Sequence, residues 1–500
     1  MKKKIALLPV DARPVTRQLP IELAKLADWE VLAPEQADLG FLKQAADVGH
    51  LQYWLKETAP KVDGMVLSID MLLYGGLVPS RIHEQEKEQL NRRLELLKEI
   101  REEHPDIQLM VFSSTMRISN NNVNEEEKEY WQTYGTAIWG LSYHTHRFET
   151  TGDEADQRRA DEWRASIPED ILHDYQATRQ INYSMNLELL QLLEGGTIDR
   201  IVFPQDDTSE YGWNVQEQAQ LSKVIREQHL SKEAVLYPGA DEVASTLLTR
   251  MIFQLEEQDL PCFYPVSSGM KGYLSSAMYE DRPLMESVKG QIFAIGSRTE
   301  DDFAQADIVL GVNVPGIKQG DLALELNMNL VDTNDRNISE WLRRLETYLG
   351  RKPVALVDLA YANGADPRMI PELLETISWQ DLIGFAAWNT AGNSIGTVVS
   401  QAALQWLADR KGMDVKEQKD HQILHRILED YLYQSIVRKE GRALLGKGEK
   451  LHDVITPLFD KKASDFLSHY ADGWEVSGIQ YPWNRTFEID FILNKKEEMS

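Results

Sequence analysis

Ile201-Val-Phe-Pro-Gln-Asp-Asp-Thr208 is the stretch of this sequence that best indicates its fold. An apolar run of strand length leads directly into two adjacent carboxylates, Asp206 and Asp207. The next apolar run, Ala234-Val-Leu-Tyr-Pro-Gly-Ala-Asp-Glu242, also ends in two adjacent acids, Asp241 and Glu242. Strands that carry acids at their carboxyl ends are a common way for α/β proteins to build an acid/base site. We therefore expect an enzyme in which these four carboxyl groups meet at one rim of a parallel sheet.

Over the first 400 residues, short apolar runs alternate with longer helical patterns, which is typical of βαβ units. The expected strands are Lys4–Val10, Trp29–Ala33, Gly64–Ile69, Gln108–Ser113, Arg200–Phe203, Ala234–Tyr237, Gln291–Ile295, Asp307–Val312, Pro353–Asp358 and Ile383–Trp388. These runs predict an α/β fold with a largely parallel sheet, preferably a (β/α)8-like barrel. Two Rossmann-like domains are the alternative, because there are slightly more strands than one barrel holds.

The pattern also predicts how the chain is divided. We expect an α/β catalytic domain over residues 1–400, with a polar, tryptophan-anchored helical insertion at about residues 120–198. Residues 401–500 predict a mainly helical C-terminal region, and the alternating segment Tyr481–Phe491 predicts a terminal edge strand.

Composition excludes several classes of partner. The formal net charge is −27 and the basic residues are scattered, which argues against nucleic acid. Apolar runs fall far short of the ~20 residues of a membrane helix, so no membrane partner is expected. A single cysteine, Cys262, and an N-terminal apolar run that ends at Asp11 indicate a cytoplasmic protein. A homo-oligomer is left open, and no cofactor or metal is implied.

Polar and aromatic side chains follow the other expected strands, where ligands bind in parallel α/β folds. We expect these residues to contact a substrate. They are Asp11, Arg13, Asp70, Tyr74, Arg81, Arg117, Asn363, Asp366, Trp388, Asn389 and Asn393.

Several motifs together resemble the bacterial Domain of Unknown Function family 4127. They are Leu7-Leu-Pro-Val-Asp-Ala-Arg-Pro14, Ser68-Ile-Asp-Met-Leu-Leu-Tyr-Gly-Gly-Leu-Val-Pro-Ser-Arg81, Asp206-Asp-Thr208, Gly239-Ala-Asp-Glu242, Tyr361-Ala-Asn-Gly-Ala-Asp366 and Trp388-Asn-Thr-Ala-Gly-Asn393. The resemblance covers nearly the whole chain and implies no particular activity.

Two local resemblances concern the acids. Asp206-Asp207 is similar to the acid pair of the β-N-acetylglucosaminidases of glycoside hydrolase family 84, and Gly239-Ala-Asp-Glu-Val243 is similar to a signature of family 20 hexosaminidases. These resemblances imply that the first acid of a pair orients the substrate's acetamido group and that the second is the general acid/base. Either Asp206 and Asp207 or Asp241 and Glu242 would take these roles.

The function expected from the sequence is therefore a glycoside hydrolase that acts on a small-molecule carbohydrate, with N-acetylhexosaminides as the class that the two local resemblances imply. Carboxylates are also ligands for Mg²⁺ and Mn²⁺, so a metal-dependent hydrolase or lyase is an alternative use of the same residues. A non-catalytic protein that binds a small anionic metabolite through the strand-end arginines is another.

Overall fold

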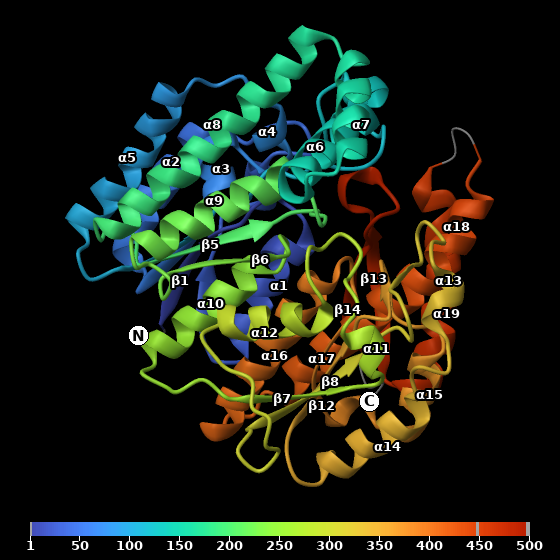
Figure 1. Ribbon diagram of the computed structural model, residues 1–500. Helices are drawn as coiled ribbons and strands as arrows, with labels where there is room; N and C mark the ends of the chain where they lie inside the picture. The colour runs from blue at the N-terminus through green and yellow to red at the C-terminus, as the bar shows by residue number, and fades with distance from the viewer. Residues whose placement is uncertain (1–2, 447–449, 497–500) are drawn as a thin grey trace. The chain divides into compact units, whose positions relative to one another are not determined.

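The computed structural model describes residues 3–446 and 450–496, and the chain divides into two compact units (Figure 1). The first unit comprises residues 1–24, 28–257 and 279–281, and the second comprises residues 25–27, 258–278 and 282–500. Each unit contains its own parallel sheet.

The first unit is built on a six-stranded sheet in the order β2-β1-β3-β4-β5-β6, with every neighbouring pair parallel. The strands are β1 (Lys4–Leu8), β2 (Glu30–Leu32), β3 (Gly64–Ser68), β4 (Gln108–Phe112), β5 (Arg200–Gln205) and β6 (Ala234–Pro238). The chain reverses its direction of travel across the sheet between β1 and β3. In open α/β sheets of this kind, ligands bind outside the carboxyl ends of the strands.

Alternate strand residues, such as Leu67 and Phe203, face one large core on one side of this sheet. Helices α2, α3, α5, α8 and α9 supply the other side of that core. Helix α10 packs against β3 and β4. The bounds of these helices, and of α1 and α4 in the same unit, are α1 (Pro14–Lys25), α2 (Val48–Thr58), α3 (Ile69–Tyr74), α4 (Leu77–Ile82), α5 (Lys87–Glu103), α8 (Glu169–Glu194), α9 (Trp213–Glu227) and α10 (Val243–Leu255).

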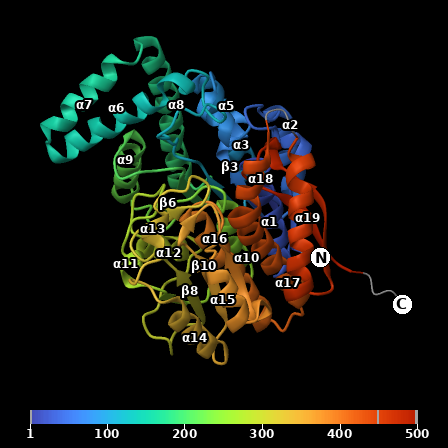
Figure 2. The same ribbon diagram turned by 90° about the vertical axis from the view of Figure 1, so that its right-hand side faces the viewer.

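Between β4 and β5 the chain leaves the sheet as an irregular segment and then forms helices α6 (Trp131–Thr151), α7 (Glu154–Ala165) and α8. Helices α6 and α7 lie side by side, as Figure 2 shows in teal. They bury a small separate core that includes Trp131, Ile138 and Tyr175. This helical segment occupies the place of the expected insertion.

The second unit is built on a four-stranded parallel sheet in the order β12-β10-β8-β7. Its strands are β7 (Phe263–Ser267), β8 (Ile308–Asn313), β10 (Val354–Asp358) and β12 (Leu382–Ala386), and a small parallel pair joins β9 (Gly320–Asp321) to β11 (Tyr361–Ala362). The helices are α11 (Met270–Tyr273), α12 (Leu284–Ala294), α13 (Met328–Val331), α14 (Ile338–Leu349), α15 (Met369–Thr376) and α16 (Ala391–Arg410).

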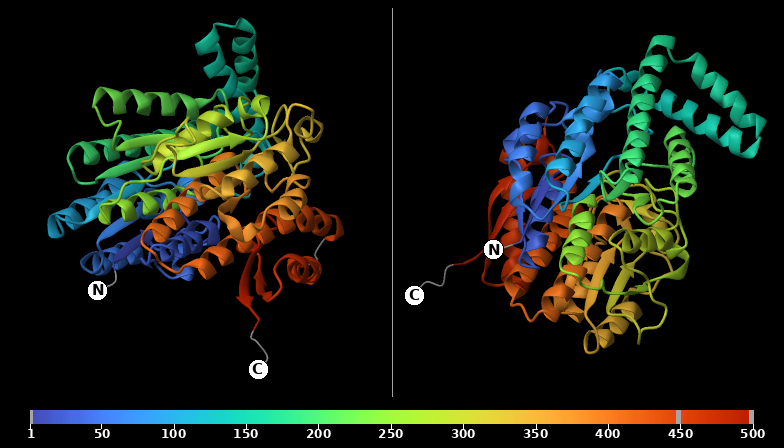
Figure 3. Two further views of the ribbon diagram at one scale, coloured as in Figure 1. Left: turned by 90° about the horizontal axis from the view of Figure 1, so that it is seen from below. Right: turned by 90° about the vertical axis from the view of Figure 1, so that its left-hand side faces the viewer.

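The C-terminal part of the second unit consists of helices followed by two strands. The helices are α17 (Lys416–Arg426), a π-helical stretch (Ile427–Val437), α18 (Arg438–Leu444) and α19 (Leu451–Tyr470). The strands β13 (Trp474–Gln480) and β14 (Asp490–Lys495) form an antiparallel pair, drawn in red in Figure 3. Its buried side chains, among them Ile423, Phe459 and Phe491, share one core with Leu356 and Phe385 of the sheet. The described division falls near residue 257 and differs from the expected boundary at residue 400, because these helices pack into the core of the second sheet.

The α/β class and the largely parallel strands are confirmed. The two larger sheets of the described residues are open, as in the two-domain alternative, and the preferred single barrel is not confirmed. Two predicted strands are wrong. Residues 291–294 end helix α12, and residues 482–484 form a short helical turn, so the terminal strand begins only at Asp490. None of the described helices is long and apolar enough to cross a membrane.

Candidate functional site

The carboxyl ends of the strands in the first sheet carry a cluster of acids and arginines. Strand β5 ends at Gln205, so Asp206 and Asp207 follow it at once. Asp207 has a φ of 33°, a left-handed conformation that is uncommon for residues other than glycine. Such conformations persist where the surrounding structure enforces them, often at functional sites.

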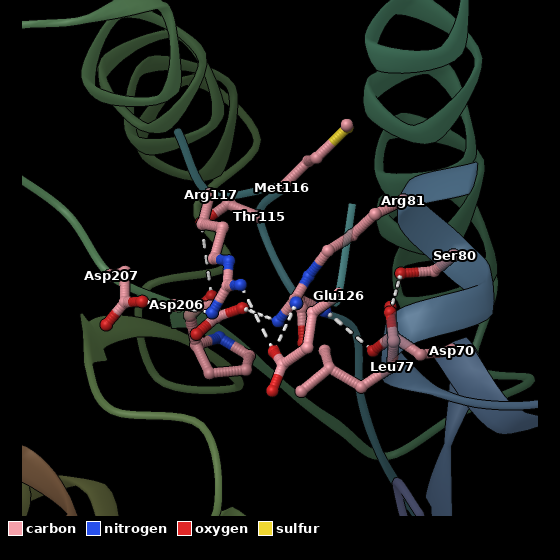
Figure 4. A network of polar contacts seen from close by, with 12 residues as sticks. Asp70, Leu77, Ser80, Arg81, Thr115, Met116, Arg117, Glu126, Asp206 and Asp207 are labelled. Atoms are coloured by element: carbon pink, nitrogen blue, oxygen red, sulfur yellow. Dashed lines mark hydrogen bonds and ion pairs between the residues drawn. The ribbon is translucent and has the colours of Figure 1, made fainter. Parts of the chain in front are cut away.

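Arg81 fixes Asp206 on one side of the cluster (Figure 4). Its side chain is 2% exposed and donates from Nη2 to Asp206 Oδ2 at 2.5 Å. Its Nη1 donates to Glu126 Oε2 at 2.8 Å. A glycine turn places this arginine, because Gly75 (φ 82°) and Gly76 (φ 139°) separate α3 from α4 with backbone conformations that favour glycine.

Arg117 makes the matching contacts with Asp207. Its Nη1 donates to Asp207 Oδ2 at 3.0 Å, and its Nε donates to Glu127 Oε1 at 2.9 Å. Its Nη2 lies 3.1 Å from the same Glu126 oxygen that Arg81 contacts. Glu126 therefore bridges two guanidinium groups, each of which also holds one acid of the pair.

Burial and charge set the ionisation of this cluster. Burial raises the pKa of Asp207 to about 6, with Arg117 opposing the shift and Asp206 adding to it. Burial lowers the pKa of Arg81 and Arg117, but the surrounding carboxylates outweigh it and leave both pKa values above the ordinary one. The side chain of Asp207 is 32% exposed and that of Asp206 is 12% exposed, so Asp207 is the more accessible of the two acids.

Asp70 lies next to these acids at the end of β3. Its Oδ2 accepts a hydrogen bond from the backbone of Ser114 at 3.0 Å. Burial raises the pKa of Asp70 to about 6, and the nearby charge of Asp206 adds to the shift. Burial, together with the charge of Asp70, raises the pKa of Tyr74 well above its ordinary value. Both residues are buried members of the predicted site.

Asp11, Arg13 and Asp241 form a second group at the ends of β1 and β6. Arg13 donates from Nε to Asp11 Oδ2 at 2.9 Å and from Nη2 to Asp241. The hydroxyl of Thr16 donates to Asp11 Oδ1 at 2.7 Å. Burial raises the pKa of Asp241, Arg13 opposes the shift, and the charge of Asp206 adds to it. The two groups therefore belong to one electrostatic cluster.

Glu242 differs from the other three acids expected at the rim. It directly precedes α10 and is 0% exposed. Its carboxylate packs beneath Gly239, where a Cβ atom would lie 2.1 Å from Glu242 Oε1. Glu242 is therefore enclosed beneath the turn after β6, and its place among the four acids expected at one rim stays a prediction.

The remaining predicted residues lie in the second unit, where Asp366 belongs to a buried polar network. Asp366 accepts from Arg336 Nη1 at 2.7 Å and from Asn313 Nδ2 at 3.1 Å. Burial, followed by the charge of Asp366, raises the pKa of Asp358 to about 7. These groups are buried at the carboxyl ends of β8 and β10.

Aromatic and amide residues follow β12 and β10 in the same unit. The ring of Trp388 lies 5.7 Å from that of Phe487. Asn363 has a φ of 61° and donates its backbone N–H to Asn389 O at 2.8 Å. Asn393 is buried in the first turn of α16. These residues, which the sequence predicted to contact a substrate, follow strands of the second sheet.

A family model described as Protein of unknown function (DUF4127) matches residues 5–492. The chain belongs to this family. The match spans both units, so the whole-chain resemblance is confirmed. No curated protein matches the chain.

The sequence did not predict two acids that complete the cluster of this DUF4127 protein. Glu126 and Glu127 lie on the irregular segment between β4 and α6, in the run Glu125-Glu-Glu-Lys128, where composition alone suggests a solvated loop. Nothing in that run distinguishes Glu126 from its exposed neighbour Glu125. Among residues 3–446 and 450–496, no three acidic, histidine or cysteine side chains are grouped as a metal ion would need.

Proposed function

We propose that this protein is a glycoside hydrolase, with Asp207 as the general acid and Asp206 as the partner carboxylate. The observation that carries the proposal is the contrast between these adjacent acids. Asp207 is partly exposed with its pKa raised to about 6. Each acid faces an arginine, but Asp206 is less exposed and lies closer to its arginine, at 2.5 Å from Arg81 against 3.0 Å between Asp207 and Arg117.

Glycoside hydrolysis needs this division of roles. One carboxyl group must carry a proton for the leaving oxygen, and another must be ionised to act on the opposite charge that develops at the sugar. A raised pKa lets the first group keep its proton to a higher pH than an ordinary carboxyl group does. The pKa of Asp207, raised to about 6 by burial, follows this pattern.

The other predicted pair supports the same assignment by contrast. Asp241 is tied to Arg13, and Glu242 is enclosed under Gly239. Buried acids with such contacts more readily support the turn after β6 than transfer a proton to a substrate. We propose that Asp11, Arg13 and Asp241 stabilise the structure of the site, and that the buried Asp70 packs beneath it.

The test is hydrolysis of a panel of aryl glycosides, including N-acetylated ones, by the wild type, Asp207→Asn and the exposed control Asp161→Asn, with and without EDTA. We expect chelator-resistant turnover that the control retains and Asp207→Asn loses by about 10²-fold or more. Turnover abolished by EDTA would contradict the proposal and favour a metal-dependent enzyme. Absence of turnover across the panel would favour a binding protein. We further propose a cytoplasmic site of action on small glycosides.

A further inference from the structure

The contacts of Glu126 point to the substrate class. Its Oε2 lies 2.8 Å from Arg81 Nη1 and 3.1 Å from Arg117 Nη2. Two guanidinium groups side by side repel each other, and each lowers the other's tendency to stay charged. A carboxylate between them offsets that repulsion, and the protein supplies one from its own chain.

The origin of Glu126 matters for the argument. Arg81 is on helix α4, and Asp206, which it contacts, directly follows β5, whereas Arg117 lies on the irregular segment between β4 and α6. Glu126 lies further along that same segment, where Asn122, Val123 and Glu125 are exposed and the next residue, Glu127, is buried against Arg117. Loops of this kind open locally at much lower free energy than packed elements.

The bridging position is also partly accessible. The side chains of Glu126 and Arg117 are 15% and 16% exposed. An incoming carboxylate that replaced Glu126 would leave the charge of the cluster unchanged. A cluster that exchanges one carboxylate for another avoids leaving buried cations unpaired.

We infer that Arg81 and Arg117 bind a carboxylate substituent of the substrate, and that the carboxylate of Glu126 occupies this binding position in the free protein. The ligand class is the uronic acids and their glycosides. The sugar part of this inference rests on the proposed function, whereas the carboxylate part rests on the arginine pair. A singly charged carboxylate fits better than a doubly charged phosphate, because Asp206, Asp207 and Glu127 already surround the two arginines.

The test is calorimetric binding of D-glucuronate and D-galacturonate, with D-glucose, D-galactose and D-glucose 6-phosphate as comparisons. The proteins are the full-length wild type, Glu126→Gln, and Glu88→Gln as a control on the exposed face of α5. Wild type should bind at least one uronate and neither neutral sugar. Glu126→Gln should bind that uronate about tenfold more tightly, because a tethered competitor has been removed. Glu88→Gln should match the wild type.

Several results would overturn the inference. These are no uronate binding by the wild type, equal or weaker uronate binding by a folded Glu126→Gln variant, or a preference for glucose 6-phosphate. The wild-type comparison decides the matter if Glu126→Gln does not fold. Cleavage of neutral aryl glycosides without uronate binding would reject this inference and keep the proposed function. Uronate binding without cleavage of any aryl glycoside, uronides included, would reject the proposed function and keep the inference that the two arginines bind a carboxylate.

Discussion

Asp206 and Asp207 are adjacent in sequence, yet the structure gives them different surroundings. The left-handed backbone at Asp207 directs the two carboxylates to different arginines. In an extended strand, successive side chains point to opposite faces, so both acids can reach one network only because the strand has ended. Because β5 ends at Gln205, both carboxylates can contact the same arginine cluster.

Asp70 should make stability depend on pH. Its folded-state pKa of about 6 lies above the ordinary value of 3.8, so its contribution is fully present below pH 3.8 and is lost as the pH rises to about 6. We expect Asp70→Asn to be more stable than wild type at pH 8, by on the order of 2 kcal/mol, and to show no such gain at pH 4. Urea unfolding at both pH values measures this difference. A loss of stability of equal size at both pH values would show that only the hydrogen bond from Ser114 matters.

Arg81 should be important for stability because it is buried with two acids. Replacing it by Met leaves Asp206 and Glu126 without their closest cation. We expect Arg81→Met to lower the free energy of unfolding by about 3–5 kcal/mol at pH 7. Adding Glu126→Gln should restore part of that loss, since one unpaired charge is removed.

The double-mutant comparison by urea unfolding tests this account of Arg81. Purely additive losses in Arg81→Met and Glu126→Gln would contradict the coupling.

At the scale of single residues, the sequence predicted most of the cluster in the first unit, because strand ends are recognisable and charged residues gather there. It could not predict Glu126 or Glu127, whose role depends on how an irregular segment returns to the sheet. It also could not separate Asp241 from Glu242, because the turn at Gly239 decides which acid faces inward.

Among the elements, apolar runs located most strands correctly and failed where periodicity is ambiguous. Residues 291–295 are apolar enough for a strand, but Leu284, Val288 and Ile292 continue the same buried face at helical spacing. Conversely, the sequence did not predict strand β7, because Pro265 within it is a residue that counts against a strand.

The packing of α6 on α7 gives a prediction about an element. A Cβ atom at Gly140 would lie 2.5 Å from the indole nitrogen of Trp163. We expect Gly140→Ala to destabilise the protein by about 1–3 kcal/mol, because the indole must move. Gly350→Ala is the control, since no atom lies within 4 Å of its Cβ position and its φ is −72°.

Thermal unfolding of the Gly140→Ala and Gly350→Ala variants provides the measurement. Equal melting temperatures would show that the contact between α6 and α7 is loose.

For the whole molecule, the sequence established the α/β class but not the number of sheets. Alternating strands and helices are compatible with one closed barrel or with two open sheets. The distinction depends on which strands pair, and no local pattern encodes the break between β6 and β7. The C-terminal helices illustrate the same difficulty, because their membership of the second core depends on contacts far apart in sequence, such as Phe459 with Phe491.

The central claim is that Asp207 donates a proton to a leaving group. It is tested most directly by kcat/KM for a phenyl glycoside and a 2,4-dinitrophenyl glycoside of the same sugar, in wild type and Asp207→Asn. Wild-type activity on the phenyl glycoside should fall as the pH rises above about 6, where Asp207 loses its proton. Asp207→Asn should lose about 10²-fold or more on the phenyl glycoside and much less on the dinitrophenyl glycoside, whose leaving group needs no proton. Equal losses on both substrates, or no loss on either, would contradict the account.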